Sequence, residues 1–244
     1  MRAVILAGLA VLVAGQAQAQ PATQPPTLPA PAAASKFLAP GDLDPALVLP
    51  PPPADDAPAA AEGRAELHRI AATVRTPARL AQAKADDALE DVRVFAPLFG
   101  PDFDLARLPN TAKLFADLRT EDSLAAKQAK AFFKRERPWL KEPDLDVCDD
   151  RHDSKNSYPS GHATMGYAAS AVLAELAPNH AQAVLARAAD YAESRLVCGV
   201  HYRGDLEAGH VLATALIDRL MTKPQFRAEV EAARTELTAA HIAP

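Results

Sequence analysis

The sequence predicts an all-α protein, and three observations support this fold class. Aromatic residues make up 5% of the 244 residues while alanine is abundant, a composition that favours helices over sheets. From about residue 62 onward, apolar residues recur at helical spacing. The sequence lacks sustained apolar–polar alternation and the Asn-Gly or Asp-Gly pairs typical of hairpins. The length fits one domain, with at most a tail.

Residues 1–19 resemble a secretory signal peptide. Met1-Arg2 gives a charged start, Ala3–Ala14 an apolar run, and Ala17-Gln18-Ala19 a small-residue cleavage pattern that predicts cleavage after Ala19. The alternative is a membrane anchor, but the run is too short to span a bilayer comfortably. We therefore expect a periplasmic or secreted protein that does not contact a membrane once the signal peptide is removed.

Residues 20–61 form a Pro/Ala-rich arm. Its first part, to about Ser35, is expected to be disordered. The run Pro50–Pro53 lacks backbone donors and favours extended polyproline geometry. Apolar residues from Phe37 to Leu49 predict that Lys36–Pro53 packs on the domain surface. The helical domain is expected to span residues 62–244.

Each expected helix in this domain is placed by a capping residue, by a proline in its first turn, or by a proline that stops it. In chain order the expected helices are Glu62–Val74; Pro77 to about Val92; a long helix capped by Asn110 or Thr111 and running through Arg137; one capped by Ser160 and running through Leu176; one capped by Asn179 and reaching about Val197; one from Asp205 to about Met221; and an amphipathic helix after Pro224.

The formal net charge of −5 argues against non-specific nucleic-acid binding, which needs a basic face. Any attraction for anions must therefore be local. The two cysteines, Cys148 and Cys198, predict a disulfide, because a cysteine pair in an exported protein is more often joined than free. Two buried thiols are the alternative. A disulfide would tie the loop before Pro159 to the segment before His201.

Pro159-Ser160-Gly161-His162 predicts an anion site at a helix start. Ser160 as the N-cap leaves backbone N–H groups pointing off the helix end, and Gly161 lets an anion approach the backbone closely. His162 would project from the first turn toward the bound group. An ordinary capping turn with a surface histidine is the alternative.

Lys130-x6-Arg137 predicts two cations on one helical face, because seven residues make almost two turns. Arg137 offers a planar fork that matches two phosphate oxygens, and Lys130 offers a point charge. A solvated basic face is the alternative, since Lys134 and Arg135 lie nearby in the sequence.

Ser194-Arg195-x5-His201-x3-Asp205 supplies a third cation and a His–Asp pair. A carboxylate that accepts from one imidazole nitrogen fixes the tautomer and leaves the other nitrogen able to attack. A structural His–Asp pair is the alternative. A metal site made of His201, Asp205 and His210 is disfavoured, because five residues separate Asp205 from His210 and would point them apart on a helix. We expect no metal and no other cofactor.

These three segments, in this order, resemble the signature of the type-2 phosphatidic-acid-phosphatase superfamily: K-x6-RP, PSGH and SR-x5-H-x3-D. The resemblance covers about residues 35 to 221. Within it, the Leu49–Pro53 arm, the Ser154–Tyr158 lead-in and the segment Cys198–Tyr202 are similar to the bacterial class A non-specific acid phosphatases. Gly204 stands where serine is expected in many relatives, a departure that removes no catalytic group.

The resemblance implies a single helical-bundle domain of the type shared with vanadium haloperoxidases, and a metal-independent phosphohydrolase. It gives His201 the role of a nucleophile that becomes phosphohistidine, Asp205 the role of orienting it, and His162 that of the general acid. Its phosphate-binding residues would be Lys130, Arg137, Ser160, Gly161 and Arg195. An acidic optimum near pH 5–6 is expected, by analogy with the reference histidine pKa of about 6.5.

Small phosphate monoesters such as nucleotides, sugar phosphates or aryl phosphates are the expected substrates, and a homo-oligomer is expected. Alternatives on the same site are a vanadate-dependent haloperoxidase and a phosphotransferase that uses alcohol acceptors. A lipid phosphatase of the same superfamily is disfavoured, because such enzymes normally have several membrane spans. A non-catalytic exported binding protein is disfavoured as well, because it would not need the intact set of His162, His201 and Asp205.

Overall fold

The computed structural model describes residues 34–148 and 155–244. The expected signal peptide, and the part of the arm up to residue 33, lie outside the described residues. Within those residues the regular secondary structure is helical and contains no strand, which confirms the all-α prediction. None of the described helices is long and apolar enough to cross a membrane.

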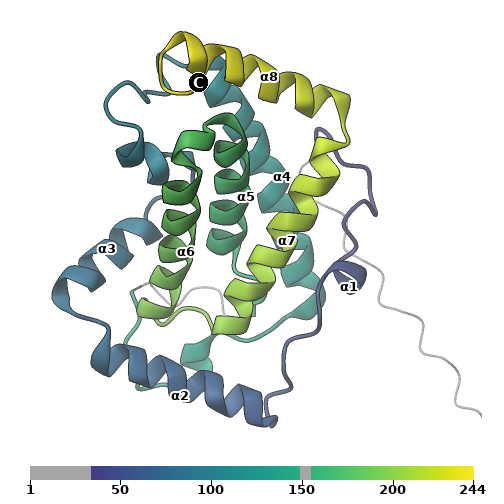
Figure 1. Ribbon diagram of the computed structural model, residues 1–244. Coiled ribbons are helices and arrows are strands. Elements are labelled where there is room, and N and C mark those ends of the chain that lie inside the picture. The colour runs from purple at the N-terminus through teal and green to yellow at the C-terminus, as the bar shows by residue number, and fades with distance from the viewer. Residues whose placement is uncertain (1–33, 149–154) are drawn as a thin grey trace, which may run out of the picture.

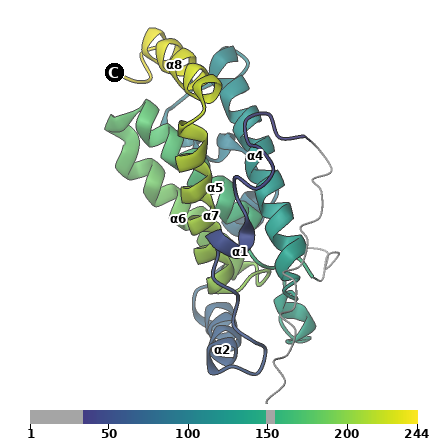
Figure 2. The same cartoon turned by 90° about the vertical axis from the view of Figure 1, so that its right-hand side faces the viewer.

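Four long helices form a bundle, with α5 packed against α4, α6 and α7 (Figure 1). Helix α8 crosses one end of this bundle and α2 crosses the other, as the two perpendicular views agree (Figures 1 and 2). The elements in chain order are α1 (Pro45–Val48), α2 (Pro58–Thr73), α3 (Pro77–Asp87), η1 (Val92–Leu98), α4 (Pro109–Phe133), η2 (Pro138–Leu140), α5 (Gly161–Leu176), η3 (Pro178–His180), α6 (Ala181–Val197), α7 (Arg203–Met221) and α8 (Pro224–Ala239).

Helix α5 occupies the centre because its residues are apolar or small on most of its circumference. Gly166 shows how closely its neighbours approach: a Cβ added there would lie 2.8 Å from Cδ1 of the buried Tyr191 on α6. On the α7 side, a Cβ added at Gly209 would lie 2.9 Å from the carbonyl oxygen of Ser160. Small residues at these positions therefore fix the position of the start of α5.

The structured part of the arm packs on α4 and α8. The Ser35 hydroxyl and the Lys36 N–H donate to the carboxylate of the buried Glu121, at 2.6 and 2.7 Å. Phe37 makes an edge-to-face contact with Phe226, with 5.4 Å between ring centroids. Further along the arm, the Pro50 carbonyl accepts from the Tyr158 hydroxyl at 2.5 Å. The arm thus ends beside the Pro159-Ser160-Gly161-His162 segment.

Several helix ends differ from the prediction. Helix α4 starts at Pro109, and the Glu236 carboxylate of α8 accepts from the N–H groups of Asn110 and Thr111, so a distant side chain supplies the cap. The other revised ends are α2, which starts at Pro58; α3, which stops at Asp87; α6, which follows His180; and α7, which starts at Arg203.

The predicted disulfide is present between Cys148 and Cys198, with their Cα atoms 4.8 Å apart. The Cys148 N–H also donates to the Cys198 carbonyl at 3.0 Å. The segment that leads from α6 to His201 is therefore tied to the loop that follows η2.

Candidate active site

Four helix ends meet at the end of the bundle near α2, and all the sequence-predicted site residues lie there. Helices α4 and α6 end at this place, while α5 and α7 begin there. The Ser160 N–H donates to the Asp205 carbonyl at 2.9 Å and so links the starts of α5 and α7. Residues that are far apart in the sequence thus converge because antiparallel neighbouring helices place alternate ends together.

The start of α5 has the geometry expected of an anion nest. Ser160 is the N-cap, and its hydroxyl accepts from the Ala163 N–H at 3.3 Å. The described part of the chain provides no acceptor for the N–H groups of Gly161 and His162. A Cβ at Gly161 would lie 3.4 Å from Glu90 Oε1 and 3.8 Å from Lys130 Nζ, so a carboxylate and an ammonium both lie at this helix end. The free N–H groups, the helix dipole and the ammonium favour an anion here, while the Glu90 carboxylate occupies the position beside them.

The prediction that Lys130 and Arg137 share one helical face is wrong. Helix α4 ends at Phe133, and Lys134 turns the chain with a φ of 52°. Arg137 lies in an extended segment before Pro138, because a residue before proline avoids helical geometry. Its guanidinium nevertheless reaches the site, where Nη1 lies 2.6 Å from the Val200 carbonyl and 2.8 Å from His201 Nε2.

His201 and Asp205 form a buried pair, with 3.2 Å between Nδ1 and Oδ2. A carboxylate accepts, so Nδ1 carries the proton and Nε2 faces Arg137 with its lone pair. Burial lowers the pKa of His201 well below its ordinary value, and the cations Arg137 and Lys130 lower it further. The lowered pKa and the Arg137 donor at Nε2 both favour the neutral imidazole, which is the state that a nucleophile requires.

Arg135 is a further site residue, which the sequence suggested only as support for the alternative of a solvated basic face. Its Nη1 donates to Asp205 Oδ1 at 2.8 Å, and its guanidinium lies over the Tyr202 ring, 4.3 Å from the centroid. Asp205 Oδ2 accepts in addition from the Ser157 hydroxyl at 2.6 Å and from the Tyr202 N–H at 2.8 Å. Burial raises the pKa of Asp205, while Arg135 and these donors oppose the rise.

The His162 ring lies between two segments that sequence analysis did not connect with the site. Its Nε2 lies 3.1 Å from the Asp87 carbonyl oxygen, and its Nδ1 lies 3.4 Å from Glu90 Oε1. A carbonyl can only accept, so Nε2 carries a proton and Nδ1 is the nitrogen that can exchange one. Burial, followed by the positive charge of Arg195, lowers the pKa of His162 well below its ordinary value.

The cations of the site differ in exposure: Lys130 is half-buried, while Arg137 and Arg195 are buried. Desolvation lowers the pKa of Lys130 to about 8, with Arg137 contributing. Arg195 is 2% exposed; its Nη1 pairs with Asp87 Oδ1, while its buried Nε has no hydrogen-bond partner among the described residues. Buried donors are normally satisfied, so Arg195 retains a donor for an incoming anion.

The described residues contain no group of three or more His, Cys, Asp or Glu side chains arranged to hold a metal ion. His210, which the metal alternative included, stacks on Tyr167 with 4.0 Å between ring centroids.

Comparison with known proteins agrees with this geometry. A family model described as the PAP2 superfamily matches residues 120–228. An acid phosphatase from Zymomonas mobilis is 35% identical over 211 residues, which cover 81% of this chain and 78% of the relative. A non-specific acid phosphatase from Salmonella typhimurium is 32% identical over 196 residues, covering 78% of each chain. One from Providencia stuartii is 28% identical over 203 residues, covering 80% of this chain and 81% of the relative. The chain therefore belongs to the PAP2 superfamily, together with these acid phosphatases.

Proposed function

We propose that this protein is an exported acid phosphatase that hydrolyses small phosphate monoesters through a phosphohistidine on His201. The observation that carries the proposal is the setting of His201. Asp205 holds its Nδ1–H, and the neutral Nε2 faces a cluster of cations beside an anion nest. This arrangement presents a nucleophile to a bound phosphoryl group.

The phosphoryl group would bind between the α5 N-terminus and the cations. Phosphoryl transfer depends mainly on positioning and on stabilisation of charge, and both are supplied by preorganised N–H groups and cations. The groups that lie there are the Gly161 and His162 N–H groups, Lys130 Nζ and Arg195 Nε, together with the Arg137 guanidinium, which also donates to the Asn156 side chain and the Val200 carbonyl.

In the first step His201 Nε2 attacks phosphorus, and the bond from phosphorus to the ester oxygen breaks. Protonated His162 gives the proton on Nδ1 to the departing oxygen, so the alcohol leaves neutral. In the second step neutral His162 takes a proton from water, the water oxygen bonds to phosphorus, and the bond to Nε2 breaks. His201 and His162 thereby return to their starting states.

The pH dependence follows from the two histidines. His201 must be neutral, and its lowered pKa keeps it neutral in mild acid. His162 must be protonated in the first step, and its lowered pKa restricts the protonated form to acidic pH. A bound phosphate anion raises this pKa, because a nearby negative charge favours the charged imidazole. An acidic optimum is the expected result. The disulfide and the N-terminal pattern support export, because disulfides persist in oxidising compartments.

The experiment is hydrolysis of p-nitrophenyl phosphate by the mature protein at mildly acidic pH with excess EDTA, with wild type beside His201→Ala. The proposal predicts activity that survives EDTA and falls below about 1% in the variant, because loss of a nucleophile costs several orders of magnitude. Loss of activity in EDTA would contradict metal independence, and an active His201→Ala variant would contradict the nucleophile.

A further inference from the structure

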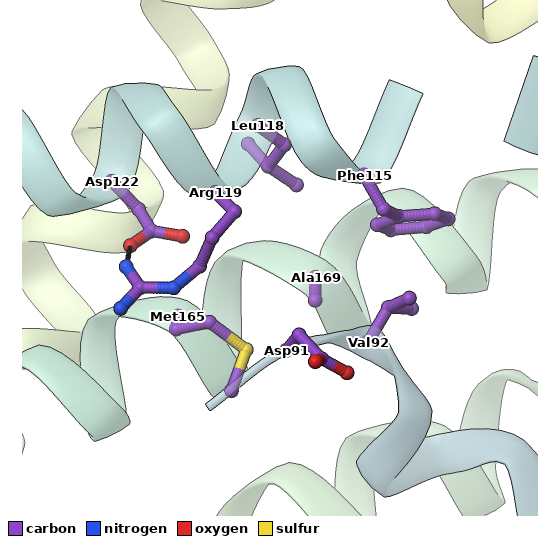
Figure 3. Close-up of a pocket in the computed structure, with 8 residues that line it drawn as sticks. All are labelled: Asp91, Val92, Phe115, Leu118, Arg119, Asp122, Met165 and Ala169. Atoms are coloured by element: carbon purple, nitrogen blue, oxygen red, sulfur yellow. Dashed lines mark hydrogen bonds and ion pairs between the residues drawn. The ribbon is translucent and has the colours of Figure 1, made fainter. Parts of the chain in front are cut away.

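Three titratable side chains, Asp122, Arg119 and Glu90, lead from the core of the bundle to the acid–base nitrogen of His162. Asp122 on α4 is 1% exposed and pairs with Arg119 Nη1, as Figure 3 shows. Arg119 Nη2 lies 2.7 Å from Glu90 Oε2, and Arg119 Nε donates to the Glu90 carbonyl at 2.9 Å. The second oxygen of this carboxylate, Oε1, lies 3.4 Å from His162 Nδ1.

This chain is held in place on each side. Tyr191 donates its hydroxyl to the Leu89 carbonyl at 2.8 Å, so the backbone beside Glu90 is fixed as well as its side chain. The cavity next to Arg119 and Asp122 has a volume of about 10 Å³, room for about one water molecule and for no substrate (Figure 3). The charged chain therefore belongs to the support of the active site and does not form a second ligand site.

The surroundings of His162 explain why a carboxylate is needed there. The charged and titratable groups around its ring come from α3, α4, α6 and the segment before α7: Asp87, Lys130, Arg119, Tyr191, Arg195 and His201. The cations among them disfavour a protonated imidazole. The Asp87 carboxylate pairs with Arg195 and lies 3.9 Å from Nε2, on the far side of the ring from Nδ1.

We propose that Glu90 is a positioning residue that stabilises the transferable proton on His162 Nδ1, and that Arg119 and Asp122 hold its carboxylate in place. This inference rests on the proposed acid role of His162. The carboxylate keeps its charge throughout: the proton moves from Nδ1 to the departing oxygen, and Glu90 makes the protonated imidazole available at a less acidic pH.

The test compares the pH dependence of kcat/KM for glycerol phosphate in wild type and Glu90→Gln, because the alkoxide of this substrate needs a proton to leave. The basic limb of this profile reports the essential acid of the free enzyme. Removing the negative charge lowers the pKa of His162, so the basic limb should move to lower pH. The expected shift is about one pH unit, which is the smallest pKa change that a nearby opposite charge usually causes. Glu90→Asp, which keeps the charge, should restore part of the difference.

Glu175→Gln is the matched control. Glu175 also pairs with an arginine, Arg234, at 2.9 Å, and lies near the C-terminal end of α5, about 20 Å along the helix from His162. Its profile should coincide with wild type. If Glu90→Gln fails to fold, Arg119→Lys tests the same point, because it retains the charge opposite Asp122 and loses the Nε donor; the limb should move in the same direction by less.

A basic limb that stays at its wild-type position in these variants would overturn the inference. The inference would also be overturned if Glu90→Gln bound inorganic phosphate more tightly while the basic limb stayed in place. In that case the Glu90 carboxylate would only compete with the anion for the start of α5. His162→Ala separates this failure from failure of the proposed function. If that variant keeps wild-type kcat/KM for glycerol phosphate, the acid role itself is wrong. If it loses this activity while the Glu90 variants leave the limb unmoved, the role of Glu90 alone is wrong.

Discussion

Gly209→Ala tests the close packing of α7 on the start of α5. A Cβ at this position would lie 2.8 Å from Ala163 Cβ, 2.9 Å from the Ser160 carbonyl oxygen and 3.1 Å from the Thr164 nitrogen. Two of these atoms belong to the backbone, so no rotamer change can make room.

The size of the effect follows from two opposing contributions. Alanine stabilises a helix interior by about 1 kcal/mol relative to glycine. Overpacking a well-filled site costs about 1–3 kcal/mol. We therefore expect a net loss of up to about 2 kcal/mol in the free energy of unfolding. The same contact displaces Ser160 and the anion nest, and kcat/KM should fall about tenfold or more, since small misplacements of reacting groups are costly.

The assay is urea unfolding with the disulfide intact, together with p-nitrophenyl phosphate kinetics. Gly63→Ala in α2 is the matched control, because its Cβ would lie 3.6 Å from Tyr202 Cδ1, an ordinary contact. That variant should gain up to about 1 kcal/mol and keep wild-type activity. The reasoning is refuted if Gly209→Ala gains stability as Gly63→Ala does and retains full kcat/KM.

Three further predictions concern the groups around the two histidines. Arg135→Gln leaves the buried Asp205 without its charged partner and should lower the free energy of unfolding by about 3–5 kcal/mol, as measured by urea titration. Arg135→Lys should recover part of this loss. Lys134→Gln, which changes an exposed neighbour, should leave the free energy of unfolding almost unchanged. Cys148→Ser with Cys198→Ser opens a link between residues 50 apart in sequence and should cost about 2–4 kcal/mol; unfolding curves that match the oxidised wild type would contradict this. His162→Ala should reduce kcat/KM for glycerol phosphate far more than for p-nitrophenyl phosphate, because an alkoxide needs a proton to leave and a nitrophenolate does not; equal losses would argue against the acid role.

Local signals were sufficient to predict the N-cap of α5. Ser160 caps α5 because the preference for serine at an N-cap is a property of the few residues involved. The pairing of His201 with Asp205 was predicted for the same reason, since four residues separate them and this spacing allows contact at a helix entry.

The end of α4 could not be predicted, because Pro138 indicated a stop one turn too late. The helix ends when Lys134 adopts a left-handed conformation, a choice for which the sequence carries no glycine or asparagine signal. Arg137 consequently reaches the site from an extended segment. The motif indicated its place at the site although the helical geometry inferred for it was wrong, and its phosphate-binding role stays a prediction.

The partners of His162 and Asp205 were missed because they depend on tertiary contacts. Glu90 was expected in the last turn of a helix that instead stops at Asp87, and Arg119 and Arg135 read as ordinary charged residues of a helix surface. Nothing in their sequence spacing connects them with the site. They become recognisable as site residues only when the helix ends are brought together.

The central claim is that the phosphoryl group passes through His201. The most direct test uses His162→Ala with p-nitrophenyl phosphate. The nitrophenolate leaves without a proton, so the first step proceeds, while the second step lacks its base and should be slow. The phosphorylated enzyme should therefore accumulate. The reaction is quenched in alkali and its peptides are analysed by mass spectrometry. The account predicts one phosphoryl group on the peptide that contains His201, at Nε2. Continued turnover with that peptide unmodified, or a phosphoryl group on a different residue, would contradict it.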